Sequence, residues 1–158
     1  MMFGGTIYNQ WRGFMKKWII LFSVLMGASS LSFGASMQSL DKEKVNKLFS
    51  DHTLTTISTV TLNGKMAKNT FTGFFGKDGK MTGQLASKPD TLPQGDKGVW
   101  KVKDNGQLCV TWEHWESAKE VCMDIYQTKN MLIFINAGTG KFESAALLEH
   151  FKEGDQMN

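Results

Sequence analysis

The stretch Trp100–Tyr126, WKVKDNGQLCVTWEHWESAKEVCMDIY, decides the fold, because it holds both cysteines of the chain. We place Cys109 opposite Cys122 on adjacent antiparallel strands. This register sets Leu108 opposite Met123, Val110 opposite Val121 and Trp112 opposite Lys119. One face then collects Leu108, Val110, Trp112, Val121, Met123 and Ile125, and the other collects Cys109, Thr111, Cys122, Asp124 and Tyr126. Apolar and polar residues alternate on both strands, so a slip of one residue would destroy the pattern.

The turn before these strands gives a second test of the register. A three-residue loop, Asp104–Gly106, with Gly106 in the left-handed conformation keeps the apolar residues on one face. The facing pairs are then Val102 with Leu108 and Trp100 with Val110. The sequence therefore predicts a three-stranded antiparallel meander.

An even count of two cysteines indicates a disulfide, here Cys109–Cys122, where the chain is exported, as the N-terminal residues described next predict. The register places this bridge on the outer, polar face. In the chain-entropy model, closing so short a loop stabilises the fold by about 3 kcal/mol.

Residues 1–34 have the features of a secretory signal peptide. Lys16-Lys17 precede an apolar run, Trp18–Met26, and small residues follow it. Cleavage is expected before Ala35. Met15 offers a later start, which would place residues 1–14 upstream of the true one. The run is shorter than the ~20 residues of a membrane span, so a retained N-terminal anchor is the less favoured alternative. These features predict a periplasmic or secreted protein with no stable membrane anchor after cleavage.

The positive net charge belongs to this leader. It contains three of the 18 basic residues, including Arg12, the only arginine. The remaining 15 lysines face 15 acidic residues. Because recognition of phosphate and guanine relies on arginine, we expect no nucleic-acid partner.

The rest of the chain predicts short strands with turns between them. The expected elements are a helix over Ser39–Ser50, with Ser39 or Asp41 as N-cap, a hairpin of Leu54–Leu62 and Lys65–Phe75 around Asn63-Gly64, a strand over Lys80–Ala86, a loop over residues 87–97, the meander, and a strand over Met131–Asn136. The two-residue loop sets Val60 opposite Ala67 and Thr56 opposite Phe71. Residues 35–52 thus form a helix and linker, and residues 53–158 a β-rich domain.

The last segment, Phe142–Phe151, favours a helix by propensity, and a closing β-strand is the alternative. The whole pattern predicts a mainly β fold. We expect an antiparallel β-barrel or a strongly curved sheet of about seven strands, with a short N-terminal helix.

An aromatic pair, a D-G turn, a G-x-W strand, an L-C strand and a second cysteine with an aromatic residue follow in order. They are Phe74-Phe75, Asp78-Gly79, Gly98-Val99-Trp100, Leu108-Cys109 and Cys122 with Tyr126. This pattern resembles the family of small exported bacterial proteins called domain of unknown function 995. The match runs from about Leu54 to Asn136, and the order of elements also resembles lipocalin-like barrels. The resemblance implies an exported, β-barrel-like fold with a disulfide, and it brings no catalytic residue.

The candidate ligand-binding residues are Trp115, His114 and Tyr126. Trp115 and His114 lie in the hairpin end Glu113–Glu120, where exposed aromatic residues could meet a ligand or partner. The favoured alternative for Trp115 is that it folds back into the core, because burial is the default for aromatic residues.

No catalytic motif is present, and no metal motif includes the histidines. We therefore expect a non-enzymatic, exported binding module for a small apolar ligand or a protein partner. One alternative is a haem- or metal-handling protein with His114 or Tyr126 as axial ligand. The second alternative is a hydrolase whose dispersed acids are Glu113, Glu116 and Glu120.

Overall fold

The computed structural model describes residues 37–57 and 59–157. The predicted signal peptide, residues 1–34, lies outside the described residues. The described residues form one antiparallel sheet of 11 short strands and one short α-helix. Within them, no helix is long and apolar enough to span a bilayer. The prediction of a mainly β, antiparallel fold is confirmed.

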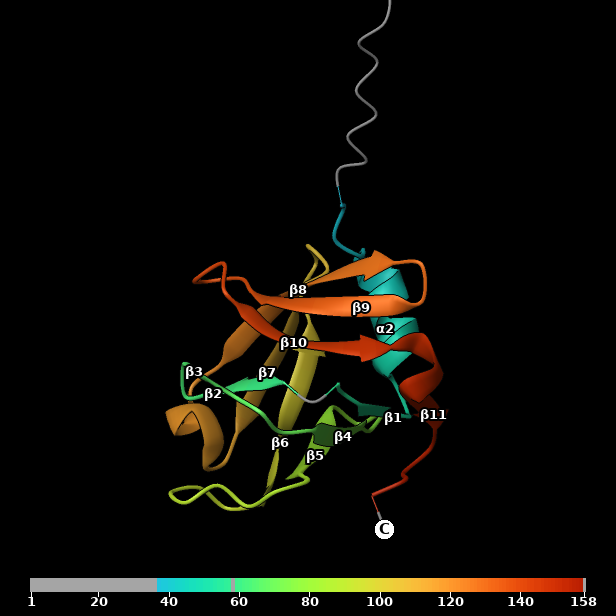
Figure 1. Cartoon of the computed structure of the whole chain (residues 1–158). Coiled ribbons are helices and arrows are strands. Elements are labelled where there is room, and N and C mark those ends of the chain that lie inside the picture. Colours follow the sequence, from blue (N-terminus) through green and yellow to red (C-terminus); the bar gives the residue numbers. More distant parts are fainter. Residues whose placement is uncertain (1–36, 58, 158) are drawn as a thin grey trace, which may run out of the picture. The chain divides into compact units, whose positions relative to one another are not determined.

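The sheet is strongly curved, and in Figure 1 β9 and β10 run across the view above β1 and β4. The strands are β1 (His52–Thr55), β2 (Val60–Leu62), β3 (Lys65–Ala67), β4 (Phe71–Phe75), β5 (Lys80–Leu85), β6 (Gly95–Val102), β7 (Leu108–Trp112), β8 (Val121–Thr128), β9 (Met131–Asn136), β10 (Phe142–Leu147) and β11 (Phe151–Glu153). Their spatial order is β11-β1-β4-β5-β6-β7-β8-β9-β10-β2-β3. The sheet is not closed into a barrel, since β11 and β3 are its two edges, and the expected count of about seven strands is too low.

The first predicted hairpin is interrupted in the middle, which accounts for part of the higher strand count. Its register is as expected: Val60 pairs with Ala67, and Thr56 N–H donates to the Phe71 carbonyl at 2.8 Å. Between these points the two strands separate. There Ile57 N–H donates to the Ala145 carbonyl at 2.8 Å, and Val60 also pairs with Ser144. The segment thus starts beside β4 and ends beside β10.

The predicted meander is confirmed as β6–β7–β8. Leu108 pairs with Met123 and Val110 with Val121, while Trp100 pairs with Val110 and Val102 with Leu108. Gly106 has the left-handed φ of 87° that the three-residue loop requires. The expected pairing of Trp112 with Lys119 is wrong, because β8 begins only at Val121. β6 also begins at Gly95, inside the segment predicted as a loop.

The C-terminal segment forms strands, so the helix predicted by propensity is wrong. Phe142–Leu147 is β10, and a one-turn 3₁₀ helix, η2 (Leu148–His150), connects it to β11. β10 pairs along β9, where Ala145 and Ala146 become buried. Pairing of this kind outweighs the helix propensity of alanine, leucine and glutamate, which amounts to only tenths of a kcal/mol per residue.

The predicted N-terminal helix is α2 (Lys42–Phe49), and Asp41 is its N-cap. The Asp41 carboxylate accepts a hydrogen bond from Lys44 N–H, as an N-cap residue should. Val45 and Phe49 are fully buried. The Phe49 ring meets Phe75 and Phe151 edge-on, with ring centroids 4.9 and 5.4 Å apart. α2 therefore joins strands from distant parts of the chain into one core.

Candidate binding cavity

A cavity of about 90 Å³ lies between β2, β4, β5, β7, β8, β10 and the turn after β7. Its inner wall is apolar and buried, formed by Val60, Phe75, Met81, Val110, Trp112 and Trp115. Its remaining wall is partly exposed and includes Thr61, Leu62, Glu116, Val121, Glu143 and Ser144. The cavity therefore reaches the surface at a rim that carries two carboxylates. We call the carboxylate pair Glu116 and Glu143 the acidic rim.

Three aromatic rings form one side of the cavity. The centroids of Trp112 and Trp115 are 4.8 Å apart, and Phe71 meets Trp112 edge-on at 5.9 Å. These rings fit because Gly83 in β5 has no side chain. A Cβ at Gly83 would lie 2.6 Å from the Trp112 ring and 2.7 Å from the Phe71 ring. The glycine thus opens the space that the aromatic wall occupies.

Asp96 fixes the turn that supplies Trp115 and Glu116. Its buried carboxylate accepts the backbone N–H groups of His114 and Trp115, at 2.9 and 2.8 Å, and the N–H of Lys97. The Nδ1–H of His114 donates to the same carboxylate at 2.9 Å. Burial alone would raise the pKa of Asp96, but these hydrogen bonds outweigh it and lower the pKa. Asp96 is therefore held as an ionised anchor beneath the turn.

The turn itself, η1 (Trp115–Ala118), has an unusual backbone. Glu116, Ser117 and Ala118 have left-handed φ values of 53°, 56° and 57°. Residues other than glycine rarely adopt this conformation, and consecutive ones are rarer still. The turn directs Trp115 into the core, where its Nε1–H donates to the Pro93 carbonyl at 3.0 Å, and places Glu116 at the rim.

Each carboxylate of the acidic rim is held by one neutral donor. Glu116 Oε1 accepts the backbone N–H of Asn63 from the β2–β3 turn. Glu143 Oε1 accepts the side-chain amide of Asn136 at 2.8 Å. Burial raises the pKa of Glu143, the Asn136 hydrogen bond lowers it, and the charge of Glu116 raises it, with a net increase. The two carboxylates are thus positioned but not neutralised.

The structure separates the three residues predicted to bind a ligand. Trp115 is fully buried and lines the cavity. The neighbouring His114 side chain is 66 % exposed and does not line it. Tyr126, on β8, is half-buried and pairs with Ser39 outside the cavity. The fold does not bring the three together.

The three acids proposed for a hydrolase are also separated. Only Glu116 lines the cavity. Glu113 is exposed beside the Asp96–His114 pair. Glu120 pairs with Lys101 and Lys103 on the outer face.

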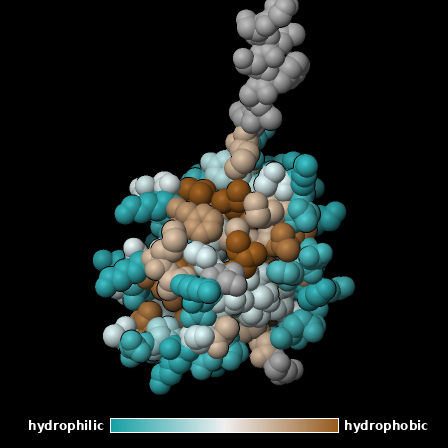
Figure 2. Space-filling view, viewed as in Figure 1, coloured by the Kyte–Doolittle hydropathy of each residue, from teal (hydrophilic) through white to brown (hydrophobic). Residues whose placement is uncertain are grey.

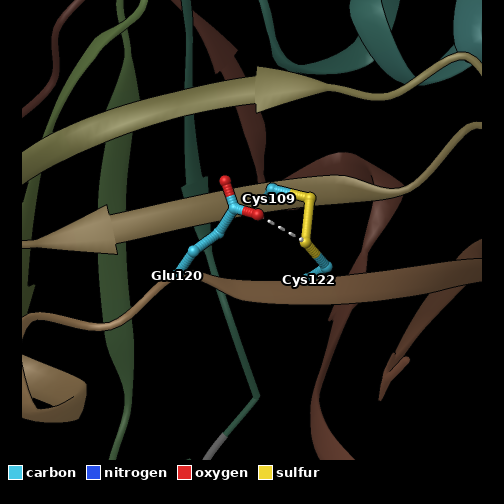
Figure 3. Close-up of side chains that lie close together, drawn as sticks. All are labelled: Cys109, Glu120 and Cys122. Atoms are coloured by element: carbon cyan, nitrogen blue, oxygen red, sulfur yellow. Dashed lines mark hydrogen bonds between the residues drawn. A yellow bond between two sulfur atoms is a disulfide. The ribbon is translucent and has the colours of Figure 1, made fainter. Parts of the chain in front are cut away.

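The disulfide Cys109–Cys122 is present, as predicted. Figure 3 shows Glu120 turned back toward it, with Oε1 3.5 Å from Cys122 Sγ. A disulfide sulfur carries no proton, so this is a close contact and not an S–H hydrogen bond. The Lys101 hydrogen bond is the main cause that lowers the pKa of Glu120. The two sulfurs and the Glu120 carboxylate lie close enough together to surround a metal ion. Metals bind cysteine as the thiolate, however, and disulfide-bonded sulfurs are not thiolates.

A second surface feature is formed by residues that do not line the cavity. Figure 2 shows brown apolar side chains gathered among teal hydrophilic ones on the face that carries β9 and β10. Ile133, Ile135 and Phe142 on these strands are only partly buried, and Ile57 is 37 % exposed.

Sequence reasoning missed Glu143, Asp96 and Gly83. Glu143 was assigned to a helix, and as a strand residue it faces the cavity instead. Asp96 stood in a segment interpreted as a loop. For Gly83, the isolated glycine inside a predicted strand was a usable signal, because such a glycine often marks a close approach by other groups.

No family model, curated protein or solved structure matches this chain. The resemblances to domain of unknown function 995 and to lipocalin-like barrels therefore stay predictions.

Proposed function

We propose that this protein is an exported binding module that takes a small apolar molecule, or the end of an apolar chain, into the cavity beside Trp112 and Trp115. The observation that carries the proposal is a cavity with a buried apolar wall and a partly exposed rim. Small-molecule sites are typically concave, mostly apolar and equipped with a few polar groups.

The size of the cavity selects the ligand. Pockets for drug-sized molecules measure roughly 300–1,000 Å³, whereas this cavity measures about 90 Å³. A short aliphatic chain matches this volume better than a large ring system such as haem. The haem alternative is further weakened because neither of its axial candidates, His114 and Tyr126, lines the cavity.

The proposed location rests on the disulfide and the signal-peptide pattern of residues 1–34. Disulfides persist in oxidising compartments such as the periplasm and the extracellular space. A periplasmic or secreted protein fits the Cys109–Cys122 bridge.

A titration with 1-pentanol tests the proposal. In ¹H–¹⁵N spectra of the full chain, we expect the indole signals of Trp112 and Trp115 to shift in a saturable manner. The indole signal of Trp100, which does not line the cavity, serves as the internal reference.

A blocking variant tests the location of binding. Ser144 lies in the partly exposed part of the cavity wall. In the variant Ser144→Phe we expect the added aromatic ring to block the opening of the cavity. We expect this variant to lose the shifts, while Thr128→Phe, at a partly buried position outside the cavity, retains them. An absence of saturable shifts in the wild type, or their persistence in Ser144→Phe, contradicts the proposal.

A further inference from the structure

The charge of the cavity lining is one-sided. Two of its residues are acidic, Glu116 and Glu143, and none is lysine, arginine or histidine. The acids come from separate elements, η1 and β10, so their convergence results from the fold and not from adjacency in the sequence.

Neither acid of the rim has a cationic partner in the described residues. Asp41, Asp51, Asp78, Asp96, Asp104 and Glu120 all form ion pairs with lysine or histidine. Glu116 and Glu143 form none, although 15 lysines follow the leader. Among the described residues, six of the other 13 carboxylates thus have a cationic partner, and the two cavity acids have none.

The hydrogen bonds of the rim leave room for a charged donor. Asn63 and Asn136 each engage the Oε1 atom of one carboxylate and contribute no positive charge. No bond to either Oε2 atom is formed by the described residues. An ionised carboxylate can accept several hydrogen bonds through its two oxygens, so each retains accepting capacity.

From the cavity and its rim, we propose that the ligand is a short alkylammonium ion, with its chain against Trp112 and Trp115 and its ammonium group at Glu116 and Glu143. This inference rests on the proposed function and specifies its ligand class. An ammonium group supplies three N–H donors and one positive charge, which matches two carboxylates with free accepting capacity. The aliphatic chain matches the apolar wall. Because an ammonium at the rim opposes the repulsion between the two acids, it also favours the ionised form of Glu143.

Three probes of equal chain length test the inference: pentylamine, 1-pentanol and pentanoate, titrated into the full chain at neutral pH. We expect pentylamine to bind at least about tenfold more tightly than 1-pentanol, as charge-assisted hydrogen bonds imply, and pentanoate to bind most weakly. The double variant Glu116→Gln/Glu143→Gln should bring pentylamine to the affinity of 1-pentanol and leave 1-pentanol unchanged.

Glu113→Gln is the matched control, because Glu113 is an exposed acid of the same loop that does not line the cavity. It should keep the full preference for pentylamine. If 1-pentanol binds and pentylamine binds no better, or if the double variant keeps the preference, the alkylammonium inference is overturned while the apolar cavity function stands. If 1-pentanol does not bind, the proposed function itself fails.

Discussion

The surroundings of Glu143 disfavour the ionised form of its carboxyl group. Burial is the main cause of its raised pKa, and the charge of Glu116 adds to it. A carboxyl group whose folded-state pKa is raised contributes stability at low pH that is lost as the pH rises through that pKa. At neutral pH the residue therefore lowers the stability of the fold, a cost that binding sites often carry.

We expect Glu143→Gln to raise the melting temperature at about pH 7 and to change it much less at about pH 4. Glutamine keeps an oxygen that can accept from Asn136 and removes the titration. Thermal unfolding at both pH values measures the effect, with the exposed Glu113→Gln as control. A destabilised Glu143→Gln at neutral pH would show that the carboxylate serves the fold.

The Asp96–His114 pair, which holds the turn η1, predicts a pH range in which it stabilises the fold most strongly. The hydrogen bond to Asp96 is the main cause that raises the pKa of His114, with a further contribution from Glu113. The raised pKa means that His114 stabilises the fold below its ordinary value of 6.5 and loses this contribution as the pH rises through the folded-state pKa. The lowered pKa of Asp96 means stabilisation above 3.8 that is lost as the pH falls through the folded-state value. The pair therefore acts most strongly between about pH 4 and pH 6.5.

A ¹H NMR titration of the His114 ring checks this prediction. In the wild type its midpoint should lie above 6.5, and in Asp96→Asn it should fall, because the partner charge is gone. Equal midpoints in the two proteins would show that Asp96 does not hold the histidine in solution.

At the scale of the element, η1 is the segment where backbone strain concentrates. Its three consecutive left-handed residues each cost about 1–2 kcal/mol relative to an ordinary conformation. Asp96 and the Trp115 side chain hold the segment from one side, and Glu116 holds it from the other through Asn63. Strain that is maintained by so many contacts is typical of segments that position functional groups.

We expect Ala118→Gly to stabilise the protein by about 0.5–1 kcal/mol, since glycine adopts left-handed angles without the steric cost of a Cβ. Ala67→Gly, in the extended strand β3, is the matched control and should have the opposite sign, with a loss of up to about 1 kcal/mol. Chemical denaturation of both variants gives the comparison. Destabilisation by Ala118→Gly would mean that the turn does not keep this conformation in solution.

The elements differ in how far local sequence determines them. The meander was predictable because alternation, a three-residue loop and two cysteines all agree on one register. The Asn63-Gly64 register was predictable too, but the separation at Ile57 was not, because it depends on Ala145 from the far end of the chain. Phe142–Leu147 was misassigned since its strand state comes from pairing with β9, which local propensity cannot show. The cavity acid Glu143 was lost with that assignment.

At the scale of the whole molecule, the disulfide is not part of the main apolar cluster, although Cys109 is fully buried and only Cys122 is partly exposed. The core side chains come from α2, η1 and strands throughout the sheet, and include Val45, Phe49, Leu85, Trp115, Ile125 and Leu132. The bridge instead links β7 to β8, which already pair through the backbone on either side of it. A cross-link between two strands that already pair mainly reduces the conformational entropy of the unfolded chain. It adds little to the geometry of the folded sheet.

Cys109→Ala/Cys122→Ala should therefore fold to the same sheet with lower stability. In the wild type the two cysteines lie 13 positions apart in the sequence. Loss of the cross-link over a loop of this size should lower the free energy of unfolding by about 3 kcal/mol. Far-UV circular dichroism at room temperature should match the wild type, and chemical denaturation should show the loss. Reduction of the wild type, through the partly exposed Cys122, should reproduce the variant's midpoint. Loss of the β-sheet signal after either treatment would contradict this prediction. It would mean that the backbone pairing of β7 with β8 and the core around Phe49 cannot maintain the curved sheet without the bridge.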